Sequence, residues 1–139
     1  MEKTNQHIKD FCEVDMTNWL ASRRHYLTGK QMNILAQFMP SKASVERDYL
    51  NCPLCAAFYL ALLLEIDRDI EKATCFLYVY FPKYKPQTLK AHLHIDMEDK
   101  VTVQTAIRWA HDTAERIYHL AQVNVRLTEM MKSKDFAFN

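Results

Sequence analysis

The chain has 139 residues, which is typical of one compact domain, and a formal net charge of +1 at pH 7. The balanced charge excludes a global field for nucleic acid. The single glycine, Gly29, excludes a Walker A loop and a GxGxxG dinucleotide motif. Scarce glycine also disfavours tight hairpin turns, so an all-α fold is predicted.

The polar N-terminal stretch MEKTNQHIKD has no apolar core of the kind that signal peptides carry. We therefore expect a cytoplasmic, reduced protein in which the four cysteines are not a disulfide framework. The apolar run at 56–64 is far shorter than the roughly twenty residues that a membrane helix needs. The prediction is one domain over 1–139 with no membrane contact.

Apolar residues at helical spacing predict helices at the start of the chain. Over 4–27 they indicate one long helix or two short ones, and over 30–40 a further helix that Pro40 ends. The segment 41–49 either runs into the next helix or breaks at Pro53. Each of these helices is expected to bury one face.

The segment 54–72 is predicted to be the central helix of the core. Asn51 is a good N-cap residue, and Pro53 stands near the first turn, where its missing N–H costs nothing. The sequence is apolar all round until Glu65, after which charged residues indicate emergence into solvent.

The region that follows has two readings. Residues 73–81 are aromatic and β-branched, and 89–97 alternate apolar with polar residues, so a β-hairpin within 73–97 is one alternative. The connection at 82–88 holds two prolines and no Gly or Asn, which makes a poor tight turn. We therefore predict a helix over 68–81 and leave 88–97 open between a short helix and an extended segment.

The last element, from Thr102 to about Lys132, has an apolar series with helical period. A helix of this length would be about 45 Å long, more than the diameter of so small a bundle. Part of it must break or pack against another chain, so we predict self-association. The candidate interface residues are Val103, Ile107, Trp109, Ala114, Ile117, Leu120 and Leu127. The expected fold is a bundle of five or six helices.

The stretch Cys52-Pro53-Leu54-Cys55 places two thiols at a helix start. The preferred interpretation is two small side chains packed in the core. The alternatives are a redox pair, because a helix N-terminus favours a thiolate, and a zinc site for which His92 with His94, or Cys75, are the candidate further ligands.

No catalytic residue is predicted. His111, Glu115 and His119 follow one another at i+4 steps, but neither the Glu-x-x-His spacing of dimetal bundles nor a second copy of it is present. These residues are therefore expected on a solvated face with i,i+4 pairs. We expect a non-enzymatic protein with no cofactor.

Two basic stretches with aromatic residues, 23–30 and 83–90, suggest an alternative function as a nucleic-acid-binding regulator. The candidate residues are Arg23, Arg24, Tyr26, Lys83, Tyr84, Lys85 and Lys90. The neutral net charge weakens this alternative. The abundance of Met and aromatic residues favours a protein–protein interaction or regulatory module whose partner is a protein, first of all a second copy.

Overall fold

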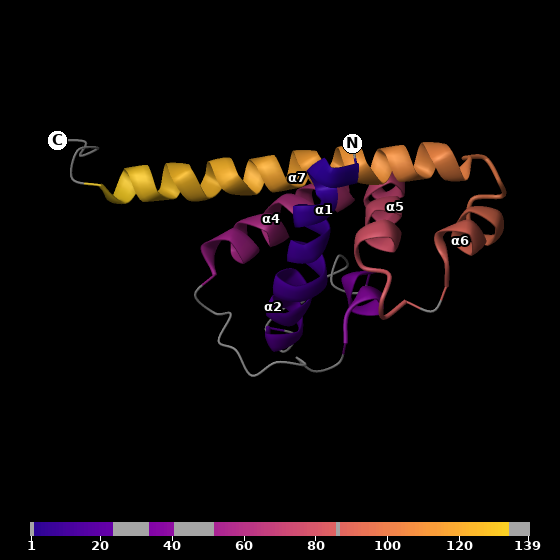
Figure 1. Ribbon diagram of the computed structural model, residues 1–139, viewed down its shortest axis with the longest axis horizontal. Helices are drawn as coiled ribbons and strands as arrows, with labels where there is room; N and C mark the ends of the chain where they lie inside the picture. The colour runs from indigo at the N-terminus through magenta and orange to yellow at the C-terminus, as the bar shows by residue number, and fades with distance from the viewer. Residues whose placement is uncertain (1, 24–33, 41–51, 86, 134–139) are drawn as a thin grey trace.

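The computed structural model describes residues 2–23, 34–40, 52–85 and 87–133, with the side chains from Asn5 onward. These residues are mostly helical and contain no strand (Figure 1). The helices are α1 (Glu2–Asp10), the π-helix η1 (Phe11–Met16), α2 (Thr17–Ser22), the 3-10 turn η2 (Ala36–Phe38), α4 (Pro53–Arg68), α5 (Ile70–Tyr80), α6 (Leu89–Ile95) and α7 (Val103–Lys132). The predicted all-α class is confirmed.

The 30-residue helix α7 runs along one side of the molecule, and α1, α4 and α5 pack against it (Figure 1). Its buried face consists mainly of small residues, which let the neighbouring helices approach its axis closely. These residues are Ala106, Ala110, Thr113, Ala114 and Ala121. None of the described helices is both long and apolar enough to cross a membrane.

The centre of the core lies between α4 and α5. Phe58 and Leu62 of α4 and Phe76 and Tyr80 of α5 are completely or almost completely buried. The rings of Phe76 and Tyr80 stack, with their centroids 5.0 Å apart. The expectation that the apolar helix after Pro53 forms the centre of the core is met by this arrangement.

The first helical stretch continues through a π-helical segment between α1 and α2. Two side chains bond the carbonyl groups of this segment: Thr17 donates to Cys12 O at 2.7 Å, and Asn18 donates to Val14 O at 2.8 Å. A π-helical turn is wider than an α-helical one, and such turns occur frequently at functional sites. The sequence pattern did not reveal it. The predicted helix end at 27, most of the helix at 30–40 and all of 41–49 fall outside the described residues.

The prediction of one helix over 54–72 is wrong at its end, because α4 stops at Arg68. Asp69 leaves helical geometry, with φ −153° and ψ 88°, and its side chain accepts a hydrogen bond from the N–H of Lys72. Asp69 thereby caps the start of α5. The chain turns at this residue, and α5 packs against α7 beside α4.

The β-hairpin alternative within 73–97 is not formed. The aromatic segment belongs to α5, and the alternating segment forms the short helix α6, whose N-cap Thr88 accepts a bond from Ala91 N–H at 3.1 Å. Burial explains the misleading alternation: of α6, only His92 and Leu93 are buried. A half-exposed helix this short need not show a clear 3.6-residue period.

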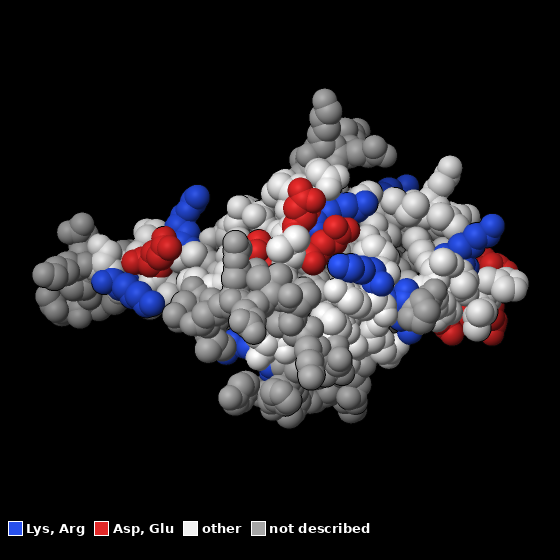
Figure 2. All heavy atoms as spheres, turned by 60° about the horizontal axis from the view of Figure 1, so that its bottom comes forward, with Lys and Arg blue, Asp and Glu red and all other residues white. Residues whose placement is uncertain are grey.

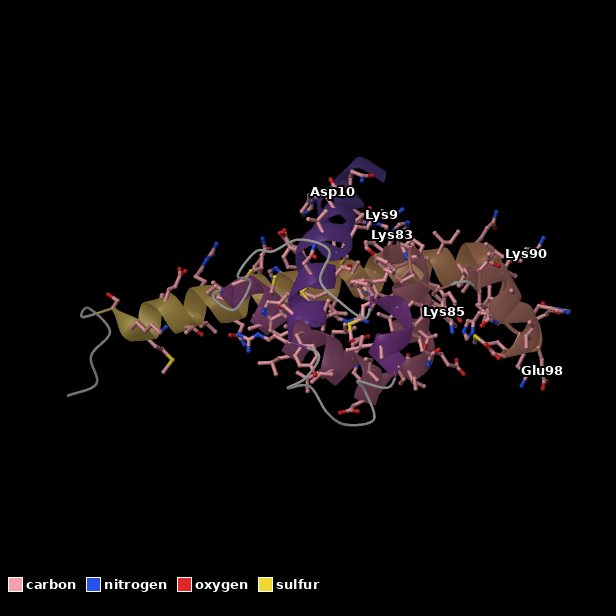
Figure 3. The ribbon with its side chains drawn as sticks, turned by 90° about the horizontal axis from the view of Figure 1, so that it is seen from below. Lys9, Asp10, Lys83, Lys85, Lys90 and Glu98 are labelled. Carbon is pink, nitrogen blue, oxygen red and sulfur yellow. The ribbon has the colours of Figure 1, made fainter. Side chains whose placement is uncertain are left out.

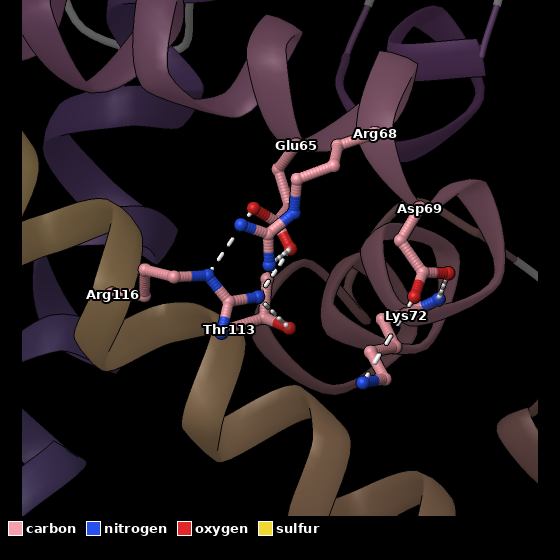
Figure 4. A network of polar contacts seen from close by, with 6 residues as sticks. All are labelled: Glu65, Arg68, Asp69, Lys72, Thr113 and Arg116. Atoms are coloured by element: carbon pink, nitrogen blue, oxygen red, sulfur yellow. Dashed lines mark hydrogen bonds and ion pairs between the residues drawn. The ribbon is translucent and has the colours of Figure 1, made fainter.

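A buried ion pair joins α4 to α7 (Figure 4). Glu65 is only 4% exposed, and both of its carboxylate oxygens accept hydrogen bonds from the guanidinium group of Arg116, the Nε bond being 3.3 Å long. Arg68 approaches the same carboxylate at 3.7 Å from the solvent side. The bidentate pair therefore fixes the C-terminal end of α4 against the middle of α7.

We expect Arg116→Met to lower the free energy of unfolding by about 3 kcal/mol, because it removes the bidentate partner of the buried Glu65 carboxylate and leaves it only the 3.7 Å contact with Arg68. The double variant Glu65→Leu/Arg116→Met should recover much of this loss. The matched control is Arg68→Met, which removes a mostly exposed arginine and should cost less than about 1 kcal/mol. Urea denaturation measures all three, and equal losses for Arg116 and Arg68 would contradict this role of the pair.

The turn between α6 and α7 holds two non-glycine residues in the left-handed region, Glu98 at φ 51° and Asp99 at φ 58°. This conformation costs about 1 kcal/mol for a residue with a Cβ. Glu98→Gly should therefore raise stability by up to about 1 kcal/mol, since the contact of Glu98 with Lys100 is a 3.9 Å pair between exposed side chains. Glu98→Ala, which removes the same carboxylate but keeps the Cβ, should give no gain in stability. Urea denaturation of the two variants and the wild type measures the difference.

Candidate interaction surface

The C-terminal half of α7 carries a row of exposed apolar side chains. Leu120, Val123, Leu127 and Met130 follow one another at spacings of three, four and three residues, and Leu120 and Leu127 are 48% and 54% exposed. This is the spacing of a coiled-coil seam. At 100° per residue, the row lies roughly 100° around α7 from the buried alanine face. We call these four residues the α7 seam.

A groove of about 240 Å³ runs between this half of α7 and the start of α4. Its α4 wall contains Pro53, Ala56, Ala57 and Leu60, and its α7 wall contains Asn124, Val125, Thr128, Glu129 and Lys132. Leu60 is 55% exposed, and Leu64, one turn further on α4, is also exposed. Apolar surface is thus available on both helices.

Some of the interface residues predicted from the sequence are buried in the structure, and others are exposed. Ala114 and Ile117 are completely buried in the chain's own core, so they cannot belong to an interface with another chain. Trp109 is half-buried under the ammonium group of Lys72, which lies 5.5 Å from its ring centroid. Val103, Ile107, Leu120 and Leu127 are exposed, the first two at the opposite end of α7 from the seam.

Cys52 and Cys55 lie at the first turn of α4, on its side away from the groove with α7. Cys52 is the N-cap residue, and its Sγ accepts a hydrogen bond from the N–H of Cys55 at 3.4 Å. Cys52 is half-buried, whereas Cys55 is completely buried. Burial, followed by a side-chain hydrogen bond with Cys52, raises the pKa of the Cys55 thiol well above its usual range. The two thiols therefore contact each other but differ in exposure.

Cys52 opens into a second groove of about 600 Å³ between η1, α4 and α7. The groove is lined by apolar and aromatic side chains together with two carboxylates and a histidine: His7, Asp10, Phe11, Val14, Asp15, Cys52, Leu54 and Tyr118. The rings of Phe11 and Tyr118 meet edge to face, with centroids 5.6 Å apart. The π-helix η1 supplies Phe11, Val14 and Asp15 to this groove. We call it the Cys52 groove.

The proposed zinc ligands His92 and His94 are engaged with carboxylates. His92 Nδ1 lies 2.8 Å from Asp96 Oδ2, and His94 Nδ1 lies 2.8 Å from Asp99 Oδ2. Both histidines belong to α6, whereas Cys52 and Cys55 belong to α4. Within the described residues, no group of three or more Cys, His, Asp or Glu side chains is arranged to hold a metal ion.

His111 has a partner that the sequence gave no sign of. Its Nδ1 lies 2.7 Å from the hydroxyl of Tyr80, which is completely buried. Burial is the main cause that raises the pKa of Tyr80 well above its usual range. Glu115 and His119 are exposed, in keeping with the predicted solvated face. A separation of 31 residues hides the Tyr80–His111 contact from any analysis of local spacing.

Several of the described basic residues of the nucleic-acid hypothesis contact other side chains of the same chain. Lys83 lies over the ring of Tyr84, Lys85 donates to Gln37 at 2.7 Å, and Arg23 lies over the ring of Trp19. Figure 3 shows Lys83, Lys85 and Lys90, the last of which belongs to α6, spread between Asp10 at one end and Glu98 at the other. Figure 2 shows both signs of charge interspersed on one face. Arg24 and Tyr26 fall outside the described residues.

Comparisons with known proteins give no relative from which a function could be transferred. No family model matches the chain, and neither the curated proteins nor the solved structures contain a match to it. Functional inference therefore depends on the surface and the side-chain geometry described above.

Proposed function

We propose that the protein is a non-enzymatic interaction module that self-associates through the α7 seam. The observation that carries this proposal is the 3-4-3 spacing of exposed Leu120, Val123, Leu127 and Met130 on a helix whose neighbouring face is already occupied by the core. A large exposed apolar row of this kind is characteristic of interaction sites. The partner is a second copy of the chain, since one seam packs on its equivalent about a two-fold axis.

The charges beside the seam favour a parallel pair. His119 and Arg126 precede the two leucines on one flank, and Asn124 and Met131 lie on the other. In a parallel coiled coil the two unlike flanks face each other, whereas in an antiparallel pair like flanks meet. An antiparallel pair would bring the two Arg126 guanidinium groups together, and a parallel pair sets each of them opposite a methionine.

The interface extends onto α4. The seam is about 15 Å long, and such a short contact does not reach the roughly 800 Å² per partner that a stable specific interface buries. Leu60 and Leu64 add exposed apolar area beside α7, and the groove between the two helices offers a concave surface next to it. The association is therefore a packing of two α4–α7 surfaces, with the seam at its centre.

The test is the mass of the protein in solution as a function of concentration. We expect a dimer in sedimentation or light scattering that dissociates on dilution. Leu127→Glu should weaken it roughly a hundredfold, because each of two symmetric leucines loses about 1.5 kcal/mol of burial. The matched control is Ile95→Glu on α6, a similarly exposed apolar residue away from the seam, which should leave the dimer unchanged.

Two results would overturn the proposal. A wild-type chain that stays monomeric up to about 1 mM has less than about 4 kcal/mol of association free energy and is not a self-associating module. A dimer that Ile95→Glu weakens as much as Leu127→Glu uses some other surface. Circular dichroism of both variants distinguishes loss of association from loss of fold.

The orientation can be measured with one introduced thiol. In a parallel pair the two copies of residue 127 share a layer, so Leu127→Cys in a Cys52→Ser background should give a covalent dimer on mild oxidation. The background removes the half-buried native thiol, while the other three cysteines are buried. In an antiparallel pair residue 127 faces position 123 instead. Val123→Cys combined with Leu127→Cys would then cross-link in both orientations and serves as the positive control.

A further inference from the structure

The arrangement of Cys52 and Cys55 separates two roles that thiol exchange requires. Cys52 is half-buried and opens into the Cys52 groove, so an incoming molecule can reach its sulfur. Cys55 is completely buried behind it and shares a side-chain hydrogen bond with it. The bond from Cys55 N–H to Cys52 Sγ folds the Cys52 side chain back over the first turn of α4, toward Cys55.

We propose that Cys52 and Cys55 are a thiol–disulfide exchange site that reacts with organic disulfides entering the Cys52 groove. Cys52 is the attacking residue, and Cys55 is the resolving residue. Both cysteines are free thiols in the structure. This inference does not depend on self-association, because both thiols and the groove belong to one chain.

The reaction has two exchanges. The Cys52 thiolate attacks one sulfur of a disulfide RSSR, forming a mixed disulfide and releasing one thiolate RS⁻, which takes up a proton. Cys55 then gives up its proton and attacks Cys52 Sγ, which forms the Cys52–Cys55 disulfide and releases the second RSH. In sum, two protein thiols are oxidised to one disulfide, and RSSR is reduced to two RSH.

The N-terminus of α4 assists the first step. The Cys55 N–H that points at Cys52 Sγ stabilises negative charge on that sulfur, and the helix dipole acts in the same direction. Burial raises the pKa of the Cys55 thiol, so Cys55 stays protonated and does not compete for the incoming disulfide. The order of attack is thus set by the difference in exposure between the two thiols and by the protonated state of Cys55.

The lining of the groove selects the class of disulfide. Asp10 and Asp15 place two carboxylates in the groove that Cys52 lines, and Phe11 and Tyr118 provide aromatic walls. Like charges repel, and cations are attracted to both carboxylates and ring faces. The groove therefore favours a cationic disulfide over an anionic one.

The experiment treats the fully reduced full-length protein with cystamine, a dicationic disulfide, and follows intact mass and released thiol. The wild type should lose two hydrogens and release two equivalents of cysteamine, and peptide mapping should place the bond between Cys52 and Cys55. Cys52→Ser should not react. Cys55→Ala should accumulate the Cys52–cysteamine adduct, because the resolving thiol is missing. Cys75→Ala, which alters a buried cysteine elsewhere, should behave as wild type.

Three outcomes would overturn the inference. One is a wild-type protein that stops at a stable adduct, one is oxidation that maps to Cys12 or Cys75, and one is the absence of reaction at Cys52 in a folded protein. Since Cys55 is buried, the Cys55→Ala result counts only if circular dichroism shows the native helix content. The Cys52→Ser variant, at a half-buried position, provides the independent check.

Charge selectivity is tested by comparing cystamine with neutral hydroxyethyl disulfide and anionic glutathione disulfide. At low salt, cystamine should react roughly tenfold faster than glutathione disulfide after correction for their intrinsic rates with free cysteine. The double variant Asp10→Asn/Asp15→Asn should remove this preference, so that the corrected rates with the three disulfides become similar. An unchanged preference in that variant would show that the groove does not select the disulfide.

Discussion

One buried electrostatic contact, the bidentate pair between Glu65 and Arg116, sets how α4 packs against α7. It fixes the C-terminal end of α4 at the middle of α7, and the groove that Pro53 and Leu60 share with Asn124 and Thr128 places the other end of α4 beside the last turns of α7. The two helices therefore run in opposite directions. A buried pair is weak as a source of stability, but it is costly to break by removing one partner, so it fixes how the two helices pack.

That packing accounts for both surfaces from which we argue function. With α4 held on one flank of α7 and α1 contacting α7 through the His7–Tyr118 and Phe11–Tyr118 ring pairs, the side chains of the seam remain 38–54% exposed. The same placement puts the first turn of α4 next to η1, where Cys52 and Asp15 line one groove. The packing of α4 on α7 is thus compatible with both an exposed α7 seam and a groove that Cys52 lines.

Periodicity predicted the long helices well, because their burial is regular. The expected helix from Thr102 to Lys132 agrees closely with α7, and the apolar helix after Pro53 agrees with α4 up to Glu65. The end of α4 could not be predicted from pattern. Asp69 looks like one more residue of a solvated face, and only its backbone geometry reveals it as the cap of a new helix. The alternation of apolar and polar residues in the short helix α6 was also misleading. Only His92 and Leu93 of this helix are buried, so its apolar residues need not follow the helical period.

The candidate site was predictable only in part. An apolar stripe shows that a helix face is either buried in the chain's own core or available for association. It does not say which of its residues the core covers, so the buried Ala114 and the exposed Leu120 looked alike in sequence. Likewise, the contact of Tyr80 with His111 and the pairing of Glu65 with Arg116 join residues far apart in the chain. Local spacing carries no information about such contacts. The two cysteines, three residues apart, were the exception, since a helix start brings such a pair together by itself.

The two proposed activities meet at the first turn of α4. Cys52 lies in one groove and the next residue, Pro53, lies in the other, beside the end of α7. A disulfide between Cys52 and Cys55 would restrict this turn, and the same turn borders the surface that we assign to self-association. Thermodynamic linkage makes any coupling between the two activities reciprocal. If forming the disulfide changes the free energy of dimerisation, then dimerisation must change the free energy of reducing that disulfide by the same amount. Equal reduction potentials for monomer and dimer would therefore mean that the two grooves act independently.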